Sequence, residues 1–424
     1  MKTLFSGIVT LLLSLNLYAT TPTVAEIKQL PLRDVMAQAE SLYNQGAYEE
    51  AYYYYQALSE MRKRMPLNDW YKLGKTALAA KKYDLAANQL APLLSKAKKF
   101  PLIHYEYALA LKYKGEHVLS SQHFQSYINT HQQESNNDYV GLAEMHLQTC
   151  QKILKEKANT SAWFLDESKD SKEDSSVVYR APTPISKHKV GFIECQTNKG
   201  TCLKKVYSDG SIHDLSGAAG NPTFNTCSPH IAADGETIFF AQQEIGQANY
   251  SIFSGVITPQ GEIDNIKKLS SGVNRVGYSS THPTTALTEH GQLILYFAST
   301  LPGSQGGYDI WYSIQTTDGK FTMAYNLGTR INGTGDDITP FYYQTDGELY
   351  FSSEKPQGYG GLDIYKMTGE KKRWLERQAH QLENPVNSKG NDFYYKKHGQ
   401  GEGSFSTDRK GKEKTVKYKK IIGA

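Results

Sequence analysis

Hydrophobic and polar positions follow three different patterns along the chain. Near the N-terminus, an apolar run from Ile8 to Leu17 follows the charged Lys2. From Leu32 to about Lys157 the apolar residues follow helical periodicity. After residue 177, short runs rich in β-branched and aromatic residues alternate with turn residues, which predicts antiparallel strands. The pattern predicts a multidomain protein with a helical part followed by an all-β part.

Residues 1–19 have the features of a secretory signal peptide. A positive start and a short apolar core are followed by the small residue Ala19 at the expected cleavage point. The apolar run is shorter than the roughly 20 residues that a membrane-spanning helix needs. We therefore expect export to the periplasm with cleavage near Ala19, and a mature chain without a transmembrane span.

A repeat of 34–35 residues runs through residues 30–157. Its copies carry matching small and large residues: Gly46, Tyr48, Ala51 and Tyr55; Lys81, Tyr83, Ala86 and Leu90; and, more loosely, Gly115, His117, Ser120 or Ser121, and Phe124. This repeat resembles the tetratricopeptide repeat, a helix–turn–helix unit. The resemblance implies an α-solenoid whose concave face holds a peptide or a partner protein. Tyr52, Tyr53 and Tyr54 are candidate partner-binding residues, although core packing explains a tyrosine run on a helix equally simply.

A charged segment without periodicity, residues 158–176, reads as a linker in which Trp163, Phe164 and Leu165 dock on one domain. A second repeat, with a period near 56 residues, follows it in residues 177–424. Gly235, Gly291 and Gly347 mark its turns, and each is followed by an apolar run. Prolines precede the turns at matching distances, and two copies end in a glycine-rich signature: Pro229, Pro283 and Pro340; Gly306, Gly307 and Asp309; Gly360, Gly361 and Asp363.

Each copy of this second repeat predicts four short antiparallel strands, which is the content of one propeller blade. With a weaker copy at either end, the repeats account for five blades, or six if an edge strand closes the ring differently, and we expect five. The signature glycines suit turns that need positive φ or leave no room for a Cβ atom, and we expect Gly361 to take positive φ. The aspartates can accept hydrogen bonds from turn amides.

The blade segments resemble the WD40-like, TolB-type propeller repeats of bacterial envelope proteins. A signal peptide, a tetratricopeptide array and such a propeller, in this order, resemble the PorE-like, OmpA-family-associated periplasmic proteins. We expect a member of this type without the C-terminal OmpA-like domain. The resemblance implies a non-enzymatic scaffold or adaptor in the cell envelope, possible membership of a type IX-like secretion system, and partners among envelope or secretion-apparatus proteins.

The four cysteines suggest one disulfide in an exported chain. Cys195 and Cys202 flank a turn between two strand-forming runs, so we expect a cross-strand bridge between them. Cys150 and Cys227 are either free or link the two halves. The chain has no C-x-x-C motif and no histidines at ligand spacing, so we expect no metal and no cofactor.

Neither the net charge nor the motifs of the chain support nucleic-acid binding or catalysis. A formal charge of +4 over 424 residues does not argue for nucleic-acid binding. The basic C-terminal tail could contact a membrane surface, or could be a solvated edge strand. No G-x-S-x-G motif occurs, and the recurring acids follow the blade period. The least repetitive acidic pair, Asp336 and Asp337, is expected in the loop that enters a blade, with catalysis or cation binding as the alternative. We therefore expect no catalytic residues and no enzyme; the alternative is a propeller that binds or cleaves glycans.

Overall fold

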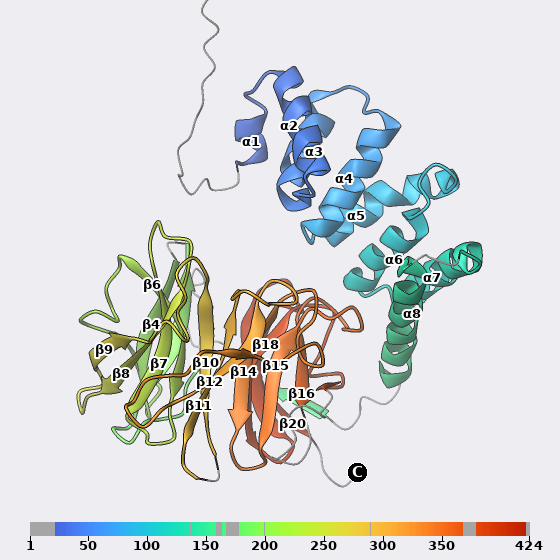
Figure 1. Ribbon diagram of the computed structural model, residues 1–424. Helices are drawn as coiled ribbons and strands as arrows, with labels where there is room; N and C mark the ends of the chain where they lie inside the picture. Colours follow the sequence, from blue (N-terminus) through green and yellow to red (C-terminus); the bar gives the residue numbers. More distant parts are fainter. Residues whose placement is uncertain are drawn as a thin grey trace, which may run out of the picture.

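The protein consists of a helical region followed by a β-propeller of five blades, as the sequence predicts (Figure 1). The computed structural model describes residues 22–134, 138–157, 163–166, 178–198, 200–288, 290–367 and 379–420. The predicted signal peptide, residues 1–19, lies outside these ranges. Among the helices of the described part, none is both long and apolar enough to cross a membrane.

Antiparallel helices stack side by side in the helical region, drawn in blue to teal in Figure 1. The small residues of the repeat, Ala51, Ala86 and Ser120, are fully buried, because neighbouring helices approach closely at these positions. Ser120, and not Ser121, is thus the small residue of the third copy. The assignment of the helices to the tetratricopeptide family stays a prediction. The helices are α1 (Val24–Ile27), α2 (Leu32–Asn44), α3 (Tyr48–Met61), α4 (Leu67–Ala79), α5 (Tyr83–Leu90), the 3₁₀ helix η1 (Ala91–Lys96), α6 (Ile103–Lys114), α7 (His117–His131) and α8 (Asp138–Lys157).

Each blade is a four-stranded antiparallel sheet. The first four blades are made of consecutive strands: β2 (Val178–Arg180), β3 (Val190–Thr197), β4 (Gly200–Tyr207) and β5 (Ile212–Asp214); β6 (Phe224–Ile231), β7 (Thr237–Glu244), β8 (Ser251–Ile257) and β9 (Ile263–Lys268); β10 (Ser280–Leu287), β11 (Leu293–Ser299), β12 (Asp309–Ile314) and β13 (Tyr325–Asn326); β14 (Asp337–Tyr343), β15 (Glu348–Ser353), β16 (Asp363–Met367) and β17 (Ala379–Gln381). The fifth contains β18 (Asp392–Gly399), β19 (Glu402–Thr407), β20 (Lys414–Lys420) and β1 (Trp163–Asp166).

The fifth blade takes its outermost strand from the segment predicted as a linker. Trp163 on β1 pairs with Lys420 on β20, and Asp166 pairs with Lys417. The predicted basic tail is therefore an inner strand of a blade rather than an exposed edge, because β1 satisfies its outer backbone groups. A strand that precedes the propeller in sequence thus completes the blade formed by the end of the chain.

In three blades, an asparagine in the loop after the fourth strand makes two hydrogen bonds to the backbone of the third strand. The Asn332 side chain accepts a hydrogen bond from Ile310 N (2.8 Å) and donates one to Ile310 O (3.0 Å). Asn274 and Asn387 make the same pair of bonds in their blades. Each asparagine is buried and follows a valine or isoleucine in the sequence. These side chains satisfy backbone groups that lie beyond the sheet ladder.

The signature aspartates accept hydrogen bonds from turn amides. Asp309 accepts from Gln305 N (2.7 Å), and Asp363 accepts from Gly360 N (3.1 Å). The expected positive φ at Gly361 is wrong, since Gly306, Gly307, Gly360 and Gly361 all lie outside the left-handed region. Close packing requires these glycines instead, because a Cβ atom on Gly361 would overlap Asn391 Oδ1 of the next blade.

Gly361→Val is expected to lower the free energy of unfolding by about 1–3 kcal/mol, because the branched side chain displaces Asn391 from its hydrogen bond with Leu362 N. Chemical denaturation measures this change. Gly141→Val is the matched control, since nothing lies within 4 Å of the Cβ position of Gly141 on α8. Equal stability of the two variants would contradict the packing role.

Cys195 and Cys202 lie opposite each other on β3 and β4, with Cα atoms 5.1 Å apart and a disulfide between them. Cys150 and Cys227 are both free and buried, so they do not link the two halves.

Candidate functional site

A pocket of about 490 Å³ lies at the propeller axis, where the five blades meet. One residue of the helical region, Lys81, also lines it. We call it the hub pocket; its lining residues are Lys81, Arg180, Glu194, Gln196, Thr201, Cys227, Tyr250, Thr281, His282, Tyr308, Asp336, Ile338, Thr339, Glu354, Leu362, Asn391, Phe393, Tyr394, Asp408 and Glu413.

An ion-pair network around the buried Glu194 joins the first and last blades at the hub pocket. Arg180 Nε donates to Glu194 Oε1 (2.6 Å), and Arg180 Nη1 lies 3.1 Å from Glu413 Oε2. Glu194 Oε2 accepts from Ser228 N (2.8 Å) and from the Tyr394 hydroxyl (3.0 Å). Only 2% of the Glu194 side chain is exposed. Because these groups come from β2, β3, β6 and β18 and from the loop before β20, the network exists only in the closed ring.

Carboxylates outnumber cations in the hub pocket. Asp336 Oδ1 accepts from Tyr308 N (2.9 Å), and Asp408 accepts from both the backbone and the side-chain nitrogen of Asn391. Glu354 forms an ion pair with Lys81. The five acids Glu194, Asp336, Glu354, Asp408 and Glu413 thus face two cations, Lys81 and Arg180. Burial raises the pKa of Glu413, and the neighbouring Glu194 and Asp408 add to this rise against the effect of Arg180.

Five left-handed residues close the axis below the hub pocket. One residue in or just after the innermost strand of each blade has φ between 50° and 56°: Ala181, Ser228, His282, Thr339 and Tyr394. In four of the blades this residue lies at a bulge in the register. The space among the five amounts to about 10 Å³, no more than one water molecule needs. The hub pocket is therefore a blind funnel, open only at one end of the propeller.

The left-handed residues at the narrow end of the hub pocket also explain why prolines recur with the period of the blades. Pro229, Pro283 and Pro340 each follow a left-handed residue, at a bulge where the strand ladder is interrupted. His282 is one of the bulge residues, and burial lowers its pKa to about 3, with Arg180 and Lys396 adding to the decrease. The imidazole is therefore neutral near pH 7.

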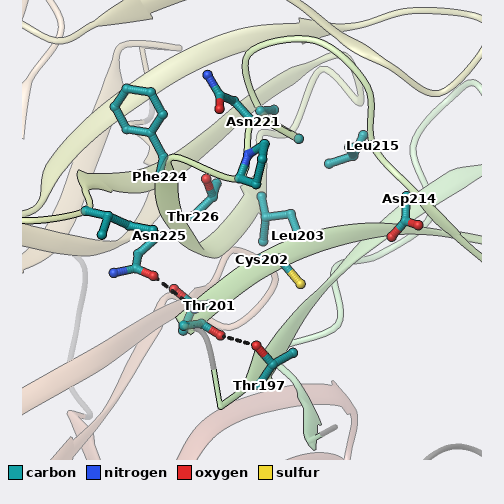
Figure 2. A pocket seen from close by; sticks show the side chains of 15 residues that line it. Thr197, Thr201, Cys202, Leu203, Asp214, Leu215, Asn221, Phe224, Asn225 and Thr226 are labelled. Carbon is teal, nitrogen blue, oxygen red and sulfur yellow. Dashed lines mark hydrogen bonds between the residues drawn. The ribbon is translucent and has the colours of Figure 1, made fainter.

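Two other pockets are each lined by a single carboxylate. A pocket of about 230 Å³ lies between the first two blades. In it, Asn225 Oδ1 accepts a hydrogen bond from Thr201 N (3.2 Å) and the Thr197 hydroxyl donates to Gly200 O (3.1 Å) (Figure 2). Its carboxylate, Asp214, is mostly exposed and paired with Lys204. A larger hollow of about 780 Å³ contains Asp234, whose carboxylate accepts bonds from its own turn.

The signature residues and the candidate tyrosines do not themselves line the hub pocket. The signature residues Gly306, Gly307, Asp309, Gly360, Gly361 and Asp363 form turns and contacts between blades. Tyr52 is buried in the helical region, while Tyr53 and Tyr54 are half-buried against the same core. Partner binding by these tyrosines stays a prediction, and the burial of Tyr52 leaves Tyr53 and Tyr54 as the residues with accessible surface.

The sequence singled out only Asp336 among the acids of the hub pocket, and the structure places it directly before β14, in the loop that enters the fourth blade. Glu354 and Asp408 each follow the second strand of their blade, whereas Glu194 lies within β3 and Glu413 precedes β20. The expectation that acids serve only turns overlooked the convergence of these side chains. Within the described residues, no group of three or more His, Cys, Asp or Glu side chains is arranged to hold a metal ion.

Comparison with known proteins gives similarity in structure alone. Neither a protein-family model nor a curated protein matches the chain. Solved structures that are similar include an α-L-arabinofuranosidase from Lactobacillus brevis, at 11% identity and a TM-score of 0.39, covering 55% of this chain and 84% of that one. The endo-arabinanase of Bacillus licheniformis has 13% identity and a TM-score of 0.40 and covers 57% and 94%. The Bacillus subtilis arabinanase has 15% identity and a TM-score of 0.39 and covers 59% and 95%.

The prediction that the protein is not an enzyme is contradicted and is not kept, because the similar structures are named as an arabinofuranosidase and as arabinanases, which are enzymes. The sequence-based exclusion considered only motifs and periodic acids, whereas glycan cleavage uses a pair of carboxyl groups that only the fold brings together. At these identities and TM-scores the likeness concerns the fold, and it gives this chain neither an activity nor a substrate.

Proposed function

We propose that the propeller binds a glycan in the hub pocket. The observation that carries this proposal is the convergence of carboxylates, a guanidinium, amides and tyrosines from all five blades on one blind cavity. Planar polar groups such as carboxylates and amides can each bond two neighbouring sugar hydroxyls, and aromatic rings cover the apolar faces of sugars. A concave site with a few convergent polar groups is also where a protein most often binds a small ligand.

The charge of the hub pocket selects among saccharides. With five acids against two cations, its field opposes anionic sugars. We therefore expect neutral or amino-bearing saccharides to bind, and saccharides with uronic acids to bind least.

The test is a glycan array with the full chain, followed by calorimetry on the saccharides that bind. Wild type should bind neutral or amino-bearing oligosaccharides, and Glu413→Gln should weaken this binding about tenfold by removing a charged acceptor. Glu402→Gln is the control, because Glu402 lies on β19 outside the hub pocket, paired with Lys419. An array without signal for wild type would refute the proposal.

Cleavage of the bound glycan is the second candidate, and the raised pKa of Glu413 favours it. Glycoside hydrolysis needs one carboxyl group that holds a proton and a second that is ionised. Glu413 has the raised pKa, and other carboxylates line the same cavity. Release of reducing ends from a saccharide that binds, lost in Glu413→Gln, would support cleavage; binding without release would leave binding alone.

Export, an envelope location and a protein partner for the helical region stay predictions. Tyr53 and Tyr54 remain the candidate residues for such a partner. Crosslinking in the cell envelope, with and without residues 30–157, tests them.

A further inference from the structure

The turns between paired helices in the helical region share one backbone conformation. Two of them have glycine at the left-handed position, and one has a lysine. Gly46, Lys81 and Gly115 occupy the same repeat position, and all three have left-handed φ, at 78°, 57° and 85°. In each turn the next residue donates a backbone hydrogen bond five residues back: Ala47 to Leu42, Lys82 to Ala77, and Glu116 to Leu111. This turn favours glycine, since a side chain is disfavoured at positive φ. Lys81 therefore occupies a glycine position at an energetic cost.

The helical region is docked on the glycine-rich loop of the fourth blade. Lys112 Nζ donates to Pro356 O (3.0 Å), and the Thr149 hydroxyl donates to Gln357 O (3.2 Å). Lys112 is fully buried, and Tyr359 of the same loop is hydrogen-bonded to Glu156. The helical region is thus held on the propeller by buried polar contacts.

This docking places the second and third turns against the propeller. The Lys389 side chain packs on Gly115 and donates to Lys114 O (3.0 Å). The Lys81 ammonium reaches the rim of the hub pocket and pairs with Glu354. Around Gly46, by contrast, no atom lies within 4 Å of the Cβ position. Of these three turns, the one with lysine instead of glycine is therefore the one whose side chain reaches the hub pocket.

We propose that Lys81 is a specificity-determining residue of the hub pocket, supplied by the helical region. Its ammonium holds the Glu354 carboxylate and so denies this acceptor to a cationic ligand. Strained residues that a fold retains concentrate at functional sites. The inference rests on the proposed glycan binding and ranks the two classes of saccharide that the charge of the pocket admits. Neutral saccharides bind more tightly than amino sugars, because the Glu354 carboxylate is already paired with Lys81.

The first experiment compares two probes that differ in charge, the neutral chitotetraose and its fully deacetylated, cationic form, by calorimetry on the full chain. Lys81→Gly should raise the affinity for the cationic probe about tenfold relative to the neutral one, because Glu354 is then unpaired. Lys82→Ala is the matched control, since it removes the same charge from the neighbouring exposed residue. An unchanged ratio in Lys81→Gly would overturn the inference. Glycine suits the turn, so this variant should melt no lower than wild type.

A second readout needs no saccharide. Carbodiimide coupling of glycine ethyl ester to Glu354, followed by mass spectrometry, reports whether an amine can reach this carboxylate. We expect at least fivefold faster coupling in Lys81→Gly than in wild type or Lys82→Ala. Equal rates would refute the role of Lys81 even if saccharides bind, whereas faster coupling without saccharide binding would uphold that role and refute the proposed function.

Discussion

Replacement of Glu194 by alanine is expected to lower the free energy of unfolding by about 3–5 kcal/mol. Glu194 is almost fully buried and accepts hydrogen bonds from Arg180, Ser228 N and the Tyr394 hydroxyl. Its removal leaves the largely buried Arg180 guanidinium without one of its two carboxylates, and the buried Ser228 N without its acceptor. Urea denaturation, followed by circular dichroism, measures the loss.

The control for this variant is Glu402→Ala. Glu402 pairs with Lys419 at 2.6 Å, but the two side chains are 46% and 68% exposed, so the loss should stay below about 1 kcal/mol. If Glu194→Ala were no less stable than Glu402→Ala, the network at the hub pocket would not hold the first and last blades together.

Stability is also expected to depend on pH through Asp337, which is completely buried at the start of β14. Burial raises the pKa of Asp337 from 3.8 to about 7, so the folded state binds a proton there that the unfolded state releases above pH 4. This contribution to stability is fully present below about pH 4 and is lost as the pH rises through 7. A change of this size corresponds to about 4 kcal/mol at most.

Asp337→Asn isolates this contribution. The amide oxygen can still accept the hydrogen bond that Gly333 N donates to Asp337 Oδ2 (2.6 Å), but the side chain no longer titrates. The difference in unfolding free energy between the variant and wild type should grow in favour of the variant between pH 4 and 7. Asp346→Asn serves as the control, since Asp346 lies in an exposed turn. Parallel pH curves for wild type and Asp337→Asn would contradict the raised pKa.

One feature of the blades had a signal in the sequence that was overlooked. Asn274, Asn332 and Asn387 each follow a valine or isoleucine at the spacing of the blades, a pattern as regular as the signature glycines. The glycines themselves were found, but their cause was misjudged. Positive φ and close packing both demand glycine, and only the position of Asn391 in the next blade distinguishes the two at Gly361.

The sequence by itself determined the local units: helix pairs every 34–35 residues, strands and turns every 56 or so, and five blades. Short-range contacts and turn conformations impose these units, and their residues lie close together in the chain. The hub pocket forms only when the ring of blades closes, because closure brings together residues as distant as Arg180 and Glu413, which are 233 residues apart in the chain. The docking of the helical region likewise decided that Lys81, one turn residue among three, reaches Glu354. Contacts between such distant residues leave no periodic trace, so only the tertiary structure reveals them.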